Sequence, residues 1–279
     1  MNVTSSESAA PIGIFDSGVG GLSVLREIAT LLPSEELLYV ADSAFGPYGE
    51  RSVRYIEQRC VSIAEFLISM RSKALVVACN TATAAIAPLL RRRFTVPIVA
   101  IEPAVKPAAS LSRTGVIGVL ATRQTLTSER FSDLIAAHAA TVEVLTEPCP
   151  ELVDLVERGM TDGVAAEDAV GRKVRSLLDR RADVIVLGCT HFHFLRPLVE
   201  SIAAGRASVI DPGVPVAREL SRRLAQAQLL SAPGCQAAER IWISGQPESR
   251  RAVIERLLRH QCEINALPAE YCRPPTSDS

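Results

Sequence analysis

The chain has 279 residues, of which 48% are hydrophobic, and its 30 basic and 31 acidic side chains give a net charge of −1. This length suits one large α/β domain or two of modest size, with enough apolar residues for a core in either case. The even charge balance leaves no broad electrostatic footprint for nucleic acid, and no apolar stretch has the character of a membrane span.

Strand-like and helix-like segments alternate along almost the whole chain. Short apolar runs with β-branched residues predict strands at residues 12–15, 37–41, 75–78, 97–101, 116–120, 142–145, 184–187, 208–210 and 241–243. Amphipathic segments predict helices at residues 22–32, 53–70, 82–94, 126–138, 165–178, 195–203, 216–229 and 248–259. Such alternation with short connections is typical of parallel sheets that are covered by helices on both faces.

The number of strands indicates two sheets rather than one. The proline-bearing turns at Ile101-Glu102-Pro103 and Asp211-Pro212-Gly213 are the expected points where the chain passes between them. We therefore predict two doubly wound (Rossmann- or flavodoxin-like) α/β domains, the first from residues 11–101 and 213–279 and the second from residues 102–212. Because open α/β sheets bind ligands at the carboxyl ends of their strands, we expect the active site in the cleft between the domains.

Two cysteines follow predicted strands in matching settings. Cys79 lies between an apolar run and Asn80-Thr81, and Cys189 lies between an apolar run and Thr190-His191. A cysteine at a strand end is most often a small buried hydrophobe. The polar residues after each sulfur favour instead one site with a thiol on each side, and the helix expected after Cys79 would lower the pKa of its thiol.

A glycine-rich loop, Asp16-Ser17-Gly18-Val19-Gly20-Gly21, joins the first predicted strand to the first predicted helix. Its spacing is not that of the dinucleotide fingerprint, and an acidic residue before the glycines would repel a pyrophosphate. The amides at the start of the helix suit the carboxylate of a small ligand, with Asp16 acting on a positive or acidic group. The plainer alternative is a glycine turn in which Asp16 caps the helix.

Two thiols that face each other across a small pocket suit proton transfer at a carbon stereocentre. A thiolate removes the proton from one face, and the opposite thiol returns a proton to the other face, which inverts the centre. Asp16 and His191 are the candidates to pass protons to the sulfurs. A proton next to a carboxylate is a poor acid, so the developing charge needs hydrogen-bond donors. Candidate donors are Asn80, Thr81, Thr190 and the amides after Asp16 and Tyr48.

Other polar residues give weaker signals. His191 and His193 lie near Cys189, but three close ligands without a fourth do not match a zinc site. Glu157, taken alone, indicates a solvated carboxylate at the end of a helical stretch. The seven cysteines include no CxxC pair, and the chain opens without a signal-peptide pattern, which is typical of reduced thiols in the cytoplasm. No lysine lies in a pyridoxal-type motif, so we predict neither cofactor nor metal.

Taken together, the motifs resemble those of glutamate racemases in the aspartate/glutamate racemase family, in order from about Ile12 to Arg259. The resemblance rests on the Asp16 loop, Pro47-Tyr48-Gly49, Cys79-Asn80-Thr81-Ala82, Ile101-Glu102-Pro103-Ala104, Val119-Leu120-Ala121-Thr122 and Gly188-Cys189-Thr190-His191. It implies a cofactor-independent isomerase that interconverts L- and D-glutamate by two-cysteine, two-base proton transfer. It also implies a role in supplying D-glutamate for peptidoglycan, in the cytoplasm.

Carried over by position, the resemblance implies that Cys79 serves one enantiomer and Cys189 the other, with Asp16, Glu157 and His191 as auxiliary acid or base groups. The substrate contacts that it implies are Asp16, Ser17, Tyr48, Gly49, Asn80, Thr81, Thr190 and His191. Two positions depart from the family pattern: Phe45 stands where arginine is common, and Phe192-His193 stands where Tyr-Pro is usual. Neither departure affects a matched contact residue.

Three other functions are weighed against this one. A racemase for another small or acidic amino acid, such as aspartate, would use the same scaffold. A ligand-binding module would not need paired thiols, and a thiol redox protein would be expected to carry a CxxC pair. The expected partner is the small-molecule substrate glutamate, without nucleic acid or membrane, and a homodimer is the default oligomer. The short polar N-terminal tail gives no basis for the gyrase binding of some relatives.

Overall fold

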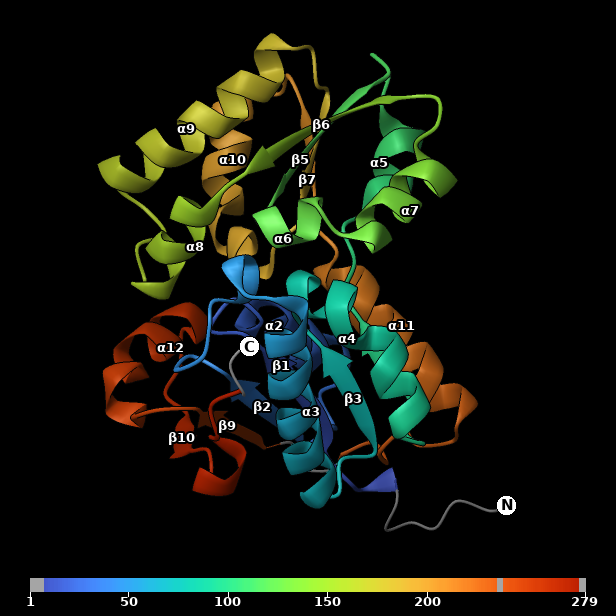
Figure 1. Cartoon of the computed structure of the whole chain (residues 1–279), viewed down its shortest axis with the longest axis vertical. Coiled ribbons are helices and arrows are strands. Elements are labelled where there is room, and N and C mark those ends of the chain that lie inside the picture. Colours follow the sequence, from blue (N-terminus) through green and yellow to red (C-terminus); the bar gives the residue numbers. More distant parts are fainter. Residues whose placement is uncertain (1–7, 235–237, 276–279) are drawn as a thin grey trace.

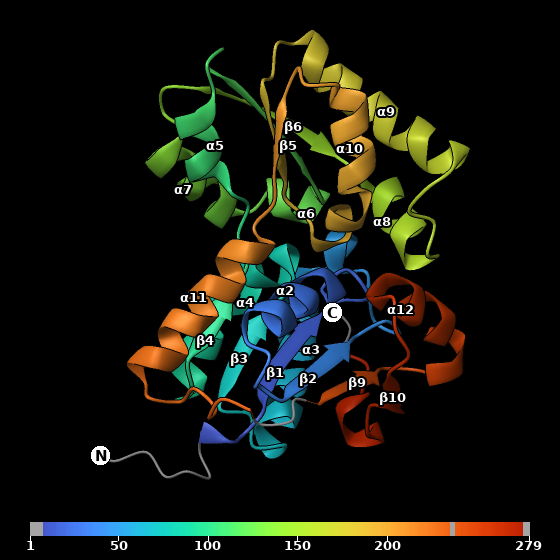
Figure 2. The same ribbon diagram turned by 180° about the vertical axis from the view of Figure 1, so that it is seen from behind.

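The computed structural model describes residues 8–234 and 238–275 and contains two sheets, one above the other (Figures 1 and 2). The six-stranded sheet has the order β10-β9-β2-β1-β3-β4, and the four-stranded sheet has the order β6-β5-β7-β8. Every strand pairing in the two sheets is parallel. The predicted fold class of two parallel-sheet α/β domains is therefore confirmed.

The larger sheet draws its strands from two separate parts of the chain. They are β1 (Ile12–Asp16), β2 (Leu37–Ala41), β3 (Ala74–Val77), β4 (Ile98–Ala100), β9 (Glu239–Ile243) and β10 (Glu263–Ala266). The smaller sheet uses the segment between them, with β5 (Val116–Ala121), β6 (Glu143–Pro148), β7 (Val184–Leu187) and β8 (Ser208–Ile210). The chain thus leaves the larger sheet after β4 and returns to its helices after β8.

Helices cover both faces of each sheet (Figures 1 and 2). Those of the larger sheet are α2 (Leu22–Leu31), α3 (Val53–Ser69), α4 (Asn80–Arg93), α11 (Gly213–Gln226) and α12 (Arg251–Leu258). Those of the smaller sheet are α5 (Val105–Leu111), α7 (Glu129–His138), α9 (Val164–Asp179) and α10 (Arg196–Ala203). The short elements are α6 (Arg123–Leu126), α8 (Pro150–Glu157), η1 (Tyr48–Glu50), η2 (Thr190–Leu195), η3 (Pro247–Ser249) and η4 (Ala269–Tyr271).

Strand β1 explains why the larger sheet needs helices on two sides. Its side chains alternate between faces, as strand geometry requires. Ile12 and Ile14 belong to the core that contains α2 and α11 residues, whereas Phe15 belongs to the core that contains α3 and α4 residues. All five residues of the strand are buried, which is why no polar residue interrupts it before Asp16 at its end.

The helix predicted at residues 126–138 is present but begins later, because α7 covers residues 129–138 and a separate short helix, α6, ends at Leu126. Each has its own N-cap: the Thr122 side chain accepts from the Thr125 amide at the start of α6, and the Ser128 side chain accepts from the Phe131 amide at the start of α7. A second capping residue starts a second helix. Strand β10 escaped prediction because polar Glu263 and Asn265 interrupt its apolar pattern.

The short helix α5 was not predicted either, and α8 was anticipated only as the helical stretch that ends at Glu157. Both are shorter than the segments that periodicity detects well. Within residues 8–234 and 238–275, none of the helices combines the length and the apolar character that crossing a bilayer requires. Cys235, one of the seven cysteines, lies outside the described residues.

Candidate active site

The predicted functional side chains converge on one cavity where the carboxyl ends of the two sheets meet. Cys79 follows β3 and Cys189 follows β7, so the two sulfurs come from different sheets. The cavity is lined by Asp16, Ser17, Pro47, Tyr48, Gly49, Cys79, Asn80, Thr81, Thr122, Val153, Cys189, Thr190 and His191. All the predicted site residues except Glu157 are in this set. Its volume of about 10 Å³ is enough for roughly one water molecule.

Asp16 ends β1 and is fully buried at the base of the cavity. Its carboxylate accepts from the amides of Ser17 and Gly21, at 2.7 and 2.6 Å, and from the Thr190 hydroxyl at 3.3 Å. The N-cap of α2 is Gly21 and no side chain caps the helix, so the plainer alternative in which Asp16 is the cap is wrong, although Asp16 does accept from the Gly21 amide. Burial raises the pKa of Asp16, although His191 and these donors oppose the change. A raised pKa makes this buried carboxylate easier to protonate than a free one, which suits a group that exchanges protons with a neighbouring thiol.

Cys79 is the N-cap of α4, as its place after β3 suggested. Its Sγ accepts from the Ala82 amide at 3.4 Å and donates to the Ser17 Oγ at 3.7 Å. The expectation that the helix lowers its pKa is wrong. Burial, followed by the nearby charge of Asp16, raises the pKa of this thiol well above its ordinary value, and the helix amide offsets only part of that increase. A protonated Cys79 therefore faces the cavity.

Cys189 is accompanied by a different acid–base pair. The His191 Nδ1 lies 3.6 Å from the Cys189 Sγ, and the His191 Nε2 lies 2.8 Å from the Glu157 Oε1. The same Glu157 oxygen accepts from the Val19 amide at 3.0 Å. Glu157 is 9% exposed, so its interpretation as a solvated surface carboxylate is wrong. Local sequence pattern could not indicate this burial, because the partners of Glu157 come from other segments, although the family resemblance implied an auxiliary acid or base role for Glu157.

The contacts of the His191–Glu157 pair favour its ionised form. Burial alone would lower the pKa of His191, but hydrogen bonds to Cys189 and Glu157 outweigh burial and raise that pKa well above its ordinary value. Burial would raise the pKa of Glu157, but the His191 contacts, the Val19 amide and the charge of Arg250 lower it. The imidazolium form is thus favoured beside the Cys189 sulfur, where it can give a proton to a thiolate, and the neutral imidazole that remains can take a proton back from the thiol.

This arrangement predicts that Glu157→Gln lowers the pKa of His191. Glutamine keeps a hydrogen-bonding side chain but removes the negative charge that stabilises the imidazolium. Titration of the histidine ring signals by NMR measures the change, and a His191→Asn variant assigns the signal. An unchanged His191 titration would mean that Glu157 does not control this group.

Several hydroxyl and amide groups line the remaining wall. Asn80 is 4% exposed, and neither its Oδ1 nor its Nδ2 has a hydrogen-bond partner in the described part of the chain, so both atoms can serve a ligand. The Thr81 Oγ1 lies 2.9 Å from that of Thr122 and 3.2 Å from that of Thr125. These threonines join α4 to α6, and therefore the two sheets, beside the cavity.

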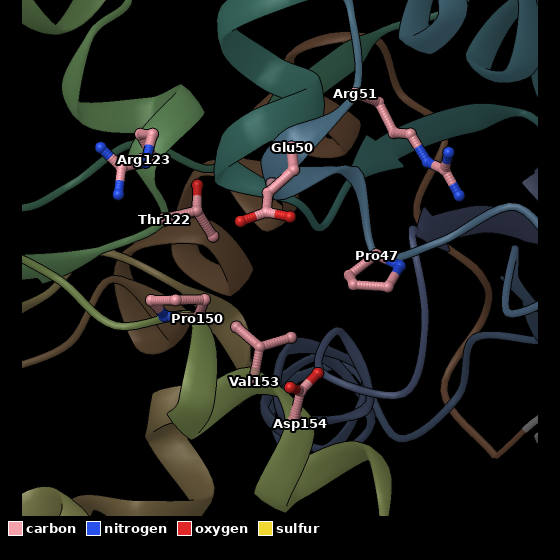
Figure 3. Close-up of a pocket in the computed structure, with 9 residues that line it drawn as sticks. Pro47, Glu50, Arg51, Thr122, Arg123, Pro150, Val153 and Asp154 are labelled. Atoms are coloured by element: carbon pink, nitrogen blue, oxygen red, sulfur yellow. The ribbon is translucent and has the colours of Figure 1, made fainter.

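A second cavity, of about 400 Å³, lies outside the first (Figure 3). Its lining is more polar and includes charged side chains of both signs, namely Glu50, Arg51, Arg123 and Asp154. It shares Pro47, Gly49, Thr122 and Val153 with the inner cavity. The outer cavity therefore adjoins the inner one across these four residues.

Sequence reasoning missed Pro47, Thr122 and Val153 as lining residues. Thr122 had a detectable signal, because it follows β5 as Cys79 follows β3, at the carboxyl end of a strand. The structure also places the two positions that depart from the family pattern. The Arg59 guanidinium lies 3.8 Å from the centre of the Phe45 ring, and the Nδ1 of the partly buried His193 lies 3.8 Å from the Asp211 Oδ1. Among the described residues, no group of three or more His, Cys, Asp or Glu side chains could hold a metal ion.

Comparison with known proteins shows which family has this sequence and this fold. Residues 12–220 match the family model for Asp/Glu/hydantoin racemase. A glutamate racemase of Ectopseudomonas mendocina is 51% identical over 261 residues, which are 93% of this chain and 99% of the relative. One of Pseudomonas aeruginosa is 51% identical over 249 residues, covering 89% and 93% of the two chains.

Solved structures give the same result. A glutamate racemase isoform of Bacillus anthracis superposes with a TM-score of 0.84 at 30% identity, covering 94% of this chain and 99% of that one. The Escherichia coli glutamate racemase in complex with L-glutamate and an activator gives 0.81 at 33% identity, covering 92% and 98%. This protein is thus an amino-acid racemase, an isomerase. The chain belongs to the Asp/Glu/hydantoin racemase family, and it matches glutamate racemases over nearly its whole length.

Proposed function

We propose that the chain interconverts L- and D-glutamate by moving a proton between two cysteines. The observation that carries this proposal is that Cys79 and Cys189 line one cavity, and each has a titratable side chain close to its sulfur. The high identity to glutamate racemases supports glutamate as the substrate.

In each direction, one cysteine acts as base and the other as acid. A thiolate on one face of the substrate takes the proton from the α-carbon, and the electron pair of the broken C–H bond moves toward the carboxylate. The opposite thiol then gives its proton to the other face of the carbon, which leaves the inverted amino acid and a thiolate on that side. Asp16 serves Cys79 and the His191–Glu157 pair serves Cys189 when the protons are restored.

The carbanionic intermediate is the costly species, because the α-proton of an amino acid is a very weak acid. Preorganised donors lower this barrier when they point to the place where negative charge develops. We assign that role to Asn80, Thr81 and Thr190, together with the amides of the Ser17 and Gly49 segments. The free amide group of Asn80 supports its part in substrate contact.

The two sheets would act as two domains, the first from residues 11–101 and 213–279 and the second from residues 102–212. The crossings near Pro103 and Pro212 are the proposed hinges, where turn residues absorb changes in dihedral angle. In the cell, we infer that the enzyme works in the cytoplasm and supplies D-glutamate for peptidoglycan. A homodimer stays a prediction that gel filtration can test.

The direct test is exchange at the α-carbon. In D₂O, L-glutamate should lose its optical activity and gain one deuterium at the α-carbon without any added cofactor. L-Aspartate, which is one methylene shorter, should react about 10- to 200-fold more slowly, since this is what one methylene contributes to discrimination in a pocket. Circular dichroism and mass spectrometry follow the two quantities. Equal rates for the two amino acids would favour the broader racemase, and the absence of exchange would refute the proposal.

A further inference from the structure

One ion pair connects the catalytic pair on the Cys189 side to a distant part of the chain. Arg250 directly precedes α12, which lies beside the end of α8 in both views (Figures 1 and 2). Its Nη1 donates to the Glu157 backbone carbonyl at 2.8 Å and lies 3.4 Å from the Glu157 Oε2. Helix α12 belongs to the larger sheet and α8 to the smaller one. The contact therefore spans the same boundary as the active site.

The position of Arg250 does not serve its own helix. A cation at a helix N-terminus is unfavourable, whereas a cation at a helix C-terminus is favourable. Arg250 stands at the N-terminus of α12 and at the C-terminal end of α8. Its favourable interactions are thus those with Glu157.

Glu157 depends on this cation for one of its two oxygens. The Oε1 is taken by the Val19 amide and His191. The Oε2 is buried and has no hydrogen bond within the described residues. Its negative charge is balanced by the ion pair with the Arg250 guanidinium, 3.4 Å away. Removing that charge would leave a buried carboxylate oxygen uncompensated, which is costly and favours rotation of the group.

A rotation of Glu157 would be transmitted to His191, because both side chains fit tightly against the glycine loop. A Cβ atom on Gly18 would lie 2.0 Å from the Glu157 Oε1, and one on Gly20 would lie 2.3 Å from the His191 Nδ1. This Nδ1 is the atom next to the Cys189 sulfur. A small displacement of the carboxylate therefore changes the geometry of proton transfer at Cys189.

We propose that Arg250 is a positioning residue for the Cys189 half of the reaction: it fixes Glu157 and thereby holds His191 against Cys189. This inference rests on the proposed two-cysteine function. Cys79 has its own partner, Asp16, so the effect of Arg250 is confined to one enantiomer. Since Arg250 reaches Glu157 across the boundary between the sheets, the His191 geometry is complete only when the two halves are together.

The chain offers two matched controls. Arg256 forms a second ion pair between α12 and the smaller-sheet region, with its Nη2 3.0 Å from the Asp162 Oδ2, but both side chains are exposed. Arg251, the neighbour of Arg250, pairs only locally with Glu248 and Glu255. Arg256→Met thus tests the effect of losing an ion pair between the larger-sheet and smaller-sheet parts. Arg251→Met tests the loss of a cation at the start of α12.

The test uses elimination, in which each cysteine acts alone. When a base removes the α-proton of 3-chloroglutamate, the electron pair expels chloride, and the resulting enamine hydrolyses to 2-oxoglutarate and ammonia. Cys79→Ser and Cys189→Ser first establish which enantiomer depends on which thiol. Arg250→Met should then slow elimination from the Cys189-dependent enantiomer by up to about a hundredfold, as for a misplaced catalytic group. The other enantiomer, and both enantiomers in the two control variants, should stay within about fivefold, as for exposed ion pairs.

Arg250→Lys keeps the positive charge and should recover most of the elimination rate that Arg250→Met loses. A role of Arg250 in stability alone would not require this selective recovery. If Arg250→Met fails to fold, the comparison of Arg250→Lys with Arg250→Gln carries the same test. Equal losses for both enantiomers, an equal loss in Arg256→Met, or no loss at all would overturn the proposal. If the cysteine variants themselves do not separate the enantiomers, it is the two-cysteine function that fails, not the role of Arg250.

Discussion

Replacing either Cys79 or Cys189 by serine is expected to lower racemisation of glutamate about a thousandfold in both directions. A hydroxyl is a far weaker acid than a thiol, and a positioned acid or base contributes about 10²- to 10⁴-fold to a rate. A complete turnover needs both groups, so the loss does not depend on the starting enantiomer. Polarimetry from pure L-glutamate and from pure D-glutamate measures both directions.

Each serine variant should nevertheless retain half of the chemistry. The surviving cysteine can still remove the proton that faces it, so elimination from one enantiomer of 3-chloroglutamate should persist while elimination from the other is lost. Cys262→Ser is the control, because Cys262 is partly exposed and lies outside the active-site cavity. Racemisation by Cys189→Ser at close to the parent rate would contradict the two-base reaction.

The parts of this site that lie at strand ends could be predicted from the sequence. Apolar strands leave a clear pattern, and in a parallel sheet their carboxyl ends lie at one edge. Asp16, Cys79 and Cys189 each follow such a pattern, and all three line the inner cavity. Thr122 follows the same pattern after β5 and could have been included on that basis.

What depends on contact between the two halves could not be predicted in this way. Glu157 becomes buried because His191, Val19 and Arg250 surround it, and these residues are distant from it in the chain. The raised pKa of Cys79 has the same origin. Helix position alone favours the thiolate, but burial in a closed cavity beside Asp16 outweighs it. The local sequence predicts the helix after Cys79, but it does not predict how deeply the fold buries the thiol.

Closure leads to the second large effect, which concerns access to the thiols. Cys79 and Cys189 are 5% and 6% exposed, and the inner cavity holds roughly one water molecule, far less than glutamate requires. Substrate must therefore enter the inner cavity when the protein is in a more open form. The outer cavity is the expected entrance, because it shares Val153 and other lining residues with the inner one. Alkylating reagents would have to use the same opening.

We expect D-glutamate to protect both cysteines from iodoacetamide together. A ligand that occupies the space between the sulfurs blocks both at once, and at a concentration one hundred times its Kd it leaves only about 1% of the sites free. The alkylation rates of Cys79 and Cys189 should thus fall by the same factor, about a hundredfold, when peptides are counted by mass spectrometry. Cys262 should react at an unchanged rate, because it lies outside the cavity. Protection of one thiol without the other at saturating ligand would mean that the two sulfurs do not share a site.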